Sequence, residues 1–275
     1  MQVSGLFIYP IKSCRGIALE RVTVLEKGFA YDREFMLVDE QGNFLTQRQY
    51  PRLATIQVSL SPTHLHLSTA NHHPFSLPLT VTGTEKPVTV WRDRVIALDQ
   101  GDQVAEWFQQ ALGLDQSVRL VRQSPDYPRP VDPNFRPQAD NTVSFADGFP
   151  ILVTNTASLA ELNQRIATNQ GQPVGMDRFR PNLVIQGDRP FAETDWQRLQ
   201  IAQVQLDLVK PCSRCIVTTT DQHTGDRREE KPLADPLATL SQFRNVPGQG
   251  ILFGENAVPH RLGDIALGDR VMVLK

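Results

Sequence analysis

Short segments in which apolar and polar residues alternate recur along the whole chain, and proline or glycine interrupts them. This alternation indicates β-strands, because successive side chains of a strand point to opposite faces of a sheet. The strands predicted in this way cover residues 3–9, 18–25, 35–39, 44–47, 53–60, 64–68, 88–98, 118–121, 151–154, 183–186, 199–209, 216–220, 251–254 and 265–274. We therefore expect a mainly β protein of the α+β class, in which the last strands complete a barrel.

Three stretches place apolar residues at helical spacing instead. The first covers residues 103–112. The second begins near Ser158, which with Glu161 fits a capping box. The third begins with Asp235 as N-cap and Pro236 at the first helical position. These helices are few and are predicted to lie at the periphery of the β structure.

A proline-rich segment divides the chain near its middle. Residues 123–149 carry five prolines between Pro125 and Pro137. A connection of this length is usually functional or disordered, so we interpret it as a lid or rim beside a cleft. With 275 residues the chain can form two closely packed modules. We place their boundary between residues 120 and 121.

Composition narrows the choice of partners and of compartment. The net charge of −2 gives no general basic excess that would favour nucleic acid. The N-terminus has no basic region before its short apolar segment, and no apolar run approaches the length of a membrane span. Three cysteines in a chain of this length indicate a reducing compartment. We expect a cytoplasmic protein without membrane or nucleic-acid partners.

Two of the cysteines, Cys212 and Cys215, flank an arginine and follow Lys210. Cationic neighbours favour the thiolate, which is the form that attacks or binds metal. The strand predicted at residues 216–220 argues against a thioredoxin-like pair, which opens a helix, and a structural zinc site would need two further ligands. Two interpretations remain open: buried structural cysteines, or one thiolate offered to a soft metal or to sulfur chemistry.

Groups that can bind an anion occur at several other strand ends. A basic loop can hold a phosphate, a strand that runs into a helix start presents free backbone amides, and paired arginines suit bidentate recognition. Each is also consistent with an ordinary turn, cap or ion pair, and we interpret Arg48 and Arg52 as structural or surface charges. Together with Cys215, such groups suit an anionic, sulfur-bearing metal cofactor. The groups that can bind an anion are Lys12, Ser13, Arg33, Asn155, Ser158, Arg180 and Asn182.

Six short motifs carry a resemblance to a known family. They are Tyr9-Pro10-Ile11-Lys12-Ser13-Cys14, Asp32-Arg33, Leu45-Thr46-x-Arg48-Gln49, Ala157-Ser158-Leu159-x-x-Leu162-Asn163, Arg180-Pro181-Asn182 and Cys212-Ser213-Arg214-Cys215-Ile216-x-Thr218-Thr219. In this order they resemble the MOSC superfamily, and in particular the branch with an N-terminal MOSC β-barrel domain that includes the mitochondrial amidoxime reducing component. The resemblance implies an N-terminal MOSC β-barrel over residues 1–120 packed on a MOSC β-barrel over residues 121–275.

The resemblance also implies a molybdenum cofactor, in which a pyranopterin dithiolene and one protein cysteine hold the metal. By motif position that cysteine is Cys215, which would be both metal ligand and catalytic residue. Pyridoxal phosphate is not expected. The residues implied to bind the cofactor are Lys12, Ser13, Arg33, Thr154, Asn155, Ser158, Arg180 and Asn182.

The activity implied by the resemblance is the reduction of small N-hydroxylated compounds, such as amidoximes, hydroxylamines and N-hydroxylated bases. The sequence has no plant-type ferredoxin cysteine run, so we expect it to receive electrons from a separate ferredoxin, flavodoxin or cytochrome. It also has no N-terminal anchor. We expect a monomer. The alternatives are a cofactor carrier or sulfur-transfer protein with a persulfide on Cys215, and a binding module with structural cysteines.

Overall fold

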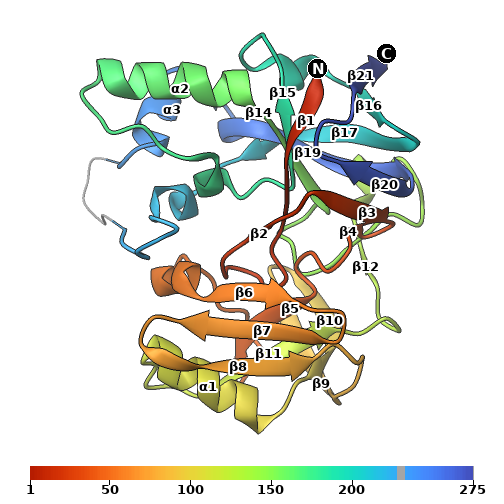
Figure 1. The fold of residues 1–275 in the computed structure, drawn as a ribbon, viewed down its shortest axis with the longest axis vertical. Helices are drawn as coiled ribbons and strands as arrows, with labels where there is room; N and C mark the ends of the chain where they lie inside the picture. Colours follow the sequence, from red (N-terminus) through yellow and green to blue (C-terminus); the bar gives the residue numbers. More distant parts are fainter. Residues whose placement is uncertain (228–232, 275) are drawn as a thin grey trace.

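The computed structural model describes residues 1–227 and 233–274, and most of its regular elements are strands. The largest sheet forms the upper lobe in Figure 1. Its nine strands are β1 (Gln2–Ile8), β2 (Ile17–Ala18), β14 (Ile151–Asn155), β15 (Leu183–Gln186), β16 (Arg198–Ile201), β17 (Val204–Ser213), β18 (Asn245–Val246), β19 (Gly250–Arg261) and β21 (Val271–Leu274). They are ordered β2-β1-β15-β14-β19-β17-β16-β21, with β18 beside β19, and only β14 and β15 run parallel.

The first and last long strands of this sheet return to each other. An isolated antiparallel bridge joins Gln2 to Arg270. Beside it, the backbone N of Val3 donates to Asp269 O at 2.9 Å, and the N of Gly268 donates to Val3 O at 2.9 Å. The sheet is thus rolled toward a barrel, although no full ladder closes the seam within the described residues. The predicted mainly β fold is confirmed.

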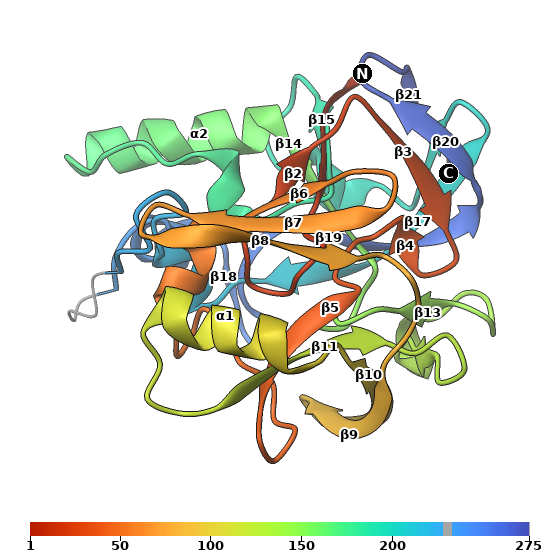
Figure 2. The ribbon, with the colours of Figure 1, turned by 60° about the horizontal axis from the view of Figure 1, so that its bottom comes forward.

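A second lobe holds two smaller sheets and one helix (Figures 1 and 2). The helix, α1 (Asp102–Leu112), buries Val104, Trp107 and Phe108 in the core that it shares with both sheets. Burial of such side chains contributes about 1.5–3 kcal/mol each and holds this lobe together. The sheets are ordered β5 (Phe35–Asp39), β11 (Val118–Gln123), β10 (Asp93–Asp99), β9 (Thr84–Val90), and β6 (Gln57–Leu60), β7 (His64–Thr69), β8 (His72–Pro78).

Early residues contribute to the same sheets as the last third of the chain. β1 pairs with β15 from Gln2 opposite Gln186, and β3 (Arg21–Leu25) lies between β4 (Gly28–Phe29) and β20 (Gly263–Ala266). The proline-rich segment, residues 123–149, holds a short hairpin, β12 (Arg129–Pro130) with β13 (Thr142–Val143). The boundary at residue 120 stays a prediction.

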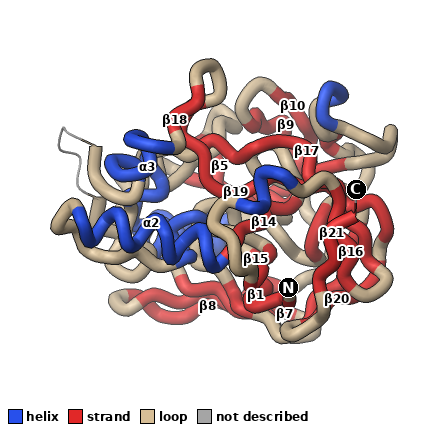
Figure 3. The backbone as a smooth tube through the Cα atoms, turned by 90° about the horizontal axis from the view of Figure 1, so that it is seen from above, coloured by secondary structure: helices blue, strands red, loops and turns tan. Residues whose placement is uncertain are grey.

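Two further helices, α2 (Thr156–Thr168) and α3 (Leu237–Phe243), lie side by side at one edge of the upper lobe (Figure 3). α3 begins one residue later than predicted, because Pro236 occupies the N-cap position while Asp235 Oδ1 accepts hydrogen bonds from the backbone N and the hydroxyl of Thr239. Within residues 1–227 and 233–274, no helix combines the length and apolar character needed to cross a membrane.

The strand predicted directly after the cysteine pair is wrong. Residues Ile216–Thr219 form a short 3-10 helix, η5; Cys212 lies near the end of strand β17, and Cys215 lies between that strand and the helix. The hydroxyls of this run bond locally: Thr218 Oγ1 donates to Cys215 O at 3.0 Å, and Thr219 Oγ1 donates to Ile216 O at 2.7 Å. Such side-chain to backbone bonds compete with a ladder, so they override the strand propensity of β-branched residues.

Candidate functional site

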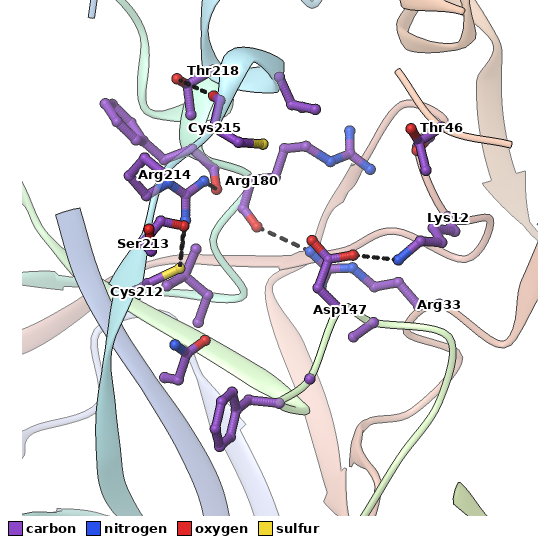
Figure 4. Close-up of a pocket in the computed structure, with 18 of the residues that line it drawn as sticks. Lys12, Arg33, Thr46, Asp147, Arg180, Cys212, Ser213, Arg214, Cys215 and Thr218 are labelled. Atoms are coloured by element: carbon purple, nitrogen blue, oxygen red, sulfur yellow. Dashed lines mark hydrogen bonds and ion pairs between the residues drawn. The ribbon is translucent and has the colours of Figure 1, made fainter. Parts of the chain in front are cut away.

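A pocket lies between loops of the first 48 residues and loops of the C-terminal half. Figure 4 shows Lys12, Arg33 and Thr46 on one wall, Cys212, Arg214 and Cys215 on the other, and Arg180 between them. One carboxylate, that of Asp147, lines it among the described residues. The cations that line it are Lys12, Arg33, Arg48, Arg180 and Arg214. This excess of positive charge suits an anionic ligand.

The structure brings six of the predicted site residues to this pocket. They come from four separate parts of the chain and are Lys12, Ser13, Arg33, Arg180, Asn182 and Cys215. Three others, Thr154, Asn155 and Ser158, are fully buried at the end of β14 and the start of α2 and do not line it. Their part in cofactor binding stays a prediction.

The polar groups of Asn155 and Ser158 bond to the protein itself. Asn155 Oδ1 accepts from the backbone N of Ala157 at 3.0 Å and so caps α2. Ser158 Oγ contacts the Glu193 carboxylate at 2.7 Å and accepts from the backbone N of Phe191 at 2.8 Å. The predicted capping box is therefore wrong, because Asn155 precedes Ser158 at the cap position and Ser158 faces a buried acid.

Replacing Asn155 by alanine is expected to lower the free energy of unfolding by about 1 kcal/mol, because one backbone amide of α2 loses its acceptor. The measurement is urea denaturation. Gln164→Ala, on the exposed face of the same helix, is the matched control and should change stability by less than about 0.5 kcal/mol. Loss of bound cofactor from Asn155→Ala, with stability unchanged, would instead favour the predicted binding role.

Three of the pocket residues have a left-handed backbone. The φ angles are 70° at Ser13, 49° at Arg33 and 54° at Arg180. Such angles are uncommon outside glycine and cost about 1–3 kcal/mol each. Strain of this kind persists only where the surroundings enforce it, and it gathers at ligand sites. Three of the eight non-glycine residues with such angles in the described part of the chain line this one pocket, which supports a functional role for them.

Two arginines share one aromatic ring at the back of the pocket. The guanidinium carbons of Arg33 and Arg180 each lie 4.2 Å from the centroid of Tyr9. Arg33 Nη1 donates to Asp32 at 2.6 Å and to Asn182 Oδ1 at 2.9 Å, and Arg33 Nη2 donates to Arg180 O at 3.1 Å. The Asp32 carboxylate therefore pairs with Arg33, while Arg180 Nη1 donates to the Gln222 amide oxygen at 3.2 Å.

Arg180 keeps a free donor inside the protein. Its Nη2 is buried and has no hydrogen-bond partner among the described residues. Burial lowers the pKa of its guanidinium to about 10, with neighbouring Tyr9 and Arg33 acting in opposite directions, so it remains charged at neutral pH. A buried donor without an acceptor is costly unless a ligand provides one. An anionic group such as a phosphate fits this position.

Lys12 and Asp147 form the rim of the pocket. Lys12 Nζ lies 2.5 Å from Asp147 Oδ1 and donates to Phe145 O at 2.8 Å. Burial lowers the pKa of Lys12, and the charge of Asp147 opposes this change. Ala146, Asp147, Gly148 and Phe149, the last residues of the 123–149 segment, line the pocket, whereas its prolines do not; a lid or rim made by the whole segment stays a prediction.

The two cysteines of the loop contact different arginines. Arg48 Nη2 lies 3.3 Å from Cys215 Sγ, and Arg214 Nη1 lies 2.8 Å from Cys212 Sγ. The interpretation of Arg48 as a structural or surface charge is therefore wrong. Its motif, Leu45-Thr46-x-Arg48-Gln49, was a signal that could have identified it. The third cysteine, Cys14, is a fully buried core side chain, and this burial raises the pKa of its thiol to about 12.

The rolled sheet and the cationic, thiol-bearing pocket define a β protein that is built to hold an anionic ligand beside a sulfur. Two family models match: the MOSC N-terminal beta barrel domain over residues 1–115 and the MOSC domain over residues 140–272. The chain is 34% identical to mitochondrial amidoxime-reducing component 1 of Homo sapiens over 99% of this chain and 82% of that protein. The chain therefore belongs to the MOSC family that contains the mitochondrial amidoxime-reducing components.

Two other proteins show a weaker similarity to this chain. The molybdenum cofactor sulfurase of Oryza sativa subsp. japonica is 30% identical over 92% of this chain and 32% of that protein. Among solved structures, the crystal structure of the YUAD protein from Bacillus subtilis aligns over 98% of this chain and 93% of that chain, with 9% identity and a TM-score of 0.40.

Proposed function

We propose that this protein is a molybdenum-cofactor-dependent oxidoreductase that reduces N-hydroxylated compounds. The observation that carries the proposal is one pocket that joins the Cys215 thiol to the unpaired Arg180 donor. The identity of 34% to an amidoxime-reducing component over 99% of the chain supports the same reaction. The substrate class is amidoximes, hydroxylamines and N-hydroxylated bases.

The residues present fit the cofactor. Cys215 would bind the metal, because a thiolate is a soft ligand. The cationic and polar side chains on the opposite wall would hold the phosphate and the pterin through charge-assisted hydrogen bonds. When bound, the group supplies two-electron oxygen-atom transfer chemistry. The side chains that would hold the phosphate and the pterin are Lys12, Ser13, Arg33, Arg180 and Asn182.

The net reaction takes two electrons and two protons: the N–O bond of the substrate breaks, an N–H bond forms, and the oxygen leaves as water. The chain contributes the geometry around the reacting centre. Arg33 and Arg180 are fixed on Tyr9, and Lys12 is fixed by Asp147, so the anion-binding donors are already in place before a ligand arrives. Such preorganisation reduces the entropy lost on binding.

Electrons come from a separate electron-transfer protein in this proposal, of the ferredoxin, flavodoxin or cytochrome type. We further propose that the enzyme is a monomer in the cytoplasm. The family resemblance supports the electron-transfer partner, and the small number of cysteines supports the cytoplasm.

A cofactor carrier or sulfur-transfer protein is the second candidate. It is favoured by the identity of 30% to a molybdenum cofactor sulfurase and by the half-buried Cys215, which could carry a persulfide. In this case the protein would bind cofactor or sulfur without turnover.

The test is to express the protein in cells with an intact cofactor pathway and to measure molybdenum and amidoxime reduction together. Near-stoichiometric molybdenum and conversion of benzamidoxime to benzamidine with reduced methyl viologen would support the reductase. Molybdenum without reduction, or a sulfane sulfur on Cys215 detected by mass spectrometry, would favour the second candidate.

A further inference from the structure

Arg48 reaches the sulfur of Cys215 from the opposite half of the chain. It lies shortly after β5, 167 positions before the cysteine, and its Nη2 is 3.3 Å from Cys215 Sγ. Its backbone is fixed on both sides, because its N donates to Thr46 Oγ1 at 3.1 Å and its O accepts from Arg227 Nη2 at 2.9 Å. The backbone from which the Arg48 side chain extends toward the sulfur is therefore held in a fixed position.

An aromatic side chain holds the guanidinium of Arg48 in place. The guanidinium carbon lies 4.4 Å from the ring centroid of Trp91. Trp91 is the first residue of the two-residue turn between β9 and β10, and its φ is 56°. For a bulky residue this angle is a genuine outlier, and glycine would fit the position better. Trp91 is also 43% exposed, so burial in a core does not explain why a tryptophan stands there.

Neighbours fix the orientation of the indole. Trp91 Nε1 donates to Asp147 Oδ1 at 3.2 Å, and the same oxygen accepts from Lys12. The ring of Phe44 meets the indole edge-on, with 5.0 Å between centroids. A continuous series of contacts therefore runs from Lys12 through Asp147 and Trp91 to Arg48, and ends at the Cys215 sulfur.

We propose that Arg48 is a positioning residue that donates a hydrogen bond to the sulfur of Cys215, and that Trp91 holds Arg48 there. This inference rests on the proposed function, in which Cys215 binds the metal. A donor and a positive charge beside a ligating sulfur draw electron density from it and favour the more reduced metal. A planar guanidinium can stack on an indole and donate at its edge simultaneously, which an ammonium group cannot do.

The experiment is a redox titration of the molybdenum-loaded protein, followed by visible absorption. We expect Arg48→Met to lower the midpoint potential and to move the sulfur-to-metal absorption band to longer wavelength. Arg48→Lys keeps the charge without the stacked fork and should give a smaller change of the same sign, as should Trp91→Leu. The control is Arg92→Met, in the same turn, because Arg92 pairs with Asp132 at 3.0 Å and is exposed. Its potential should equal that of wild type.

Equal potentials in wild type, Arg48→Met and Arg92→Met would overturn the role of Arg48, while an active wild type would leave the proposed function standing. Should Arg48→Met not retain molybdenum, unchanged potentials in both Arg48→Lys and Trp91→Leu would overturn it instead. A wild type that binds no molybdenum would overturn the proposed function and the role of Arg48 together.

Discussion

Replacing Cys215 by serine is expected to reduce bound molybdenum and reductase activity by at least about 100-fold, since a protein ligand should matter at least as much as its outer-shell partners. Serine offers a hard oxygen that does not ionise near neutral pH, whereas the metal requires a soft thiolate. The measurements are elemental analysis of the purified protein and benzamidoxime reduction with reduced methyl viologen. Both should fall together, because the same atom would serve binding and turnover.

Cys212→Ser is the matched control for this experiment. The substitution is chemically identical and lies three positions away, and Cys212 is likewise half-buried, but its sulfur contacts Arg214 instead of Arg48. We expect this variant to retain molybdenum. Equal losses in both variants, or full molybdenum content in Cys215→Ser, would contradict the assignment of Cys215 as the ligand.

Arg180→Met is expected to weaken retention of the cofactor by about 10- to 100-fold. One charge-assisted hydrogen bond contributes about 1.5–3 kcal/mol, and 1.4 kcal/mol corresponds to a factor of ten. The stability of the metal-free protein should change little or increase, because the substitution removes a buried cation beside Arg33 and leaves an apolar chain against Tyr9. The measurements are molybdenum content after extended dialysis and thermal unfolding of the metal-free protein.

Arg178→Met provides the opposite pattern. Arg178 donates to Asp221 at 2.8 Å and to Thr219 O at 3.0 Å, and it does not line the pocket. Its loss removes the donor from Thr219 O and from Asp221 Oδ2, so we expect reduced thermal stability with the cofactor retained. If Arg180→Met kept its cofactor as firmly as wild type, the free donor of Arg180 would not be the phosphate site.

The mainly β fold and part of the pocket could be predicted because their signals are local. Alternation defines strands, and the Lys12 loop and the cysteine loop carry their chemistry within a few residues. The 3-10 helix after Cys215 was missed because hydrogen bonds from threonine hydroxyls to backbone carbonyls stabilise its conformation, and strand propensity does not take such bonds into account. The motif around Arg48 could have marked it as a site residue, but its contact with Cys215 could not be derived from the sequence, since it depends on Trp91 at a distant hairpin tip. Asn155 was ambiguous for another reason, because an asparagine directly before a helix is typical both of a capping residue and of an anion-binding site.

The place of β1 has a consequence for how the chain acquires its structure during synthesis. β1 is synthesised well before β15, with which it pairs where Gln2 lies opposite Gln186, and the start of β1 is bridged to Arg270. β1 can pair early with β2, but its apolar side chains Val3, Leu6 and Ile8 lack their other neighbouring strand until residues 183–186 have been made. Pairings between such distant segments form slowly, and an unpaired apolar strand is prone to associate with other chains. Nascent chains of this protein should accordingly depend on holding chaperones until β15 emerges.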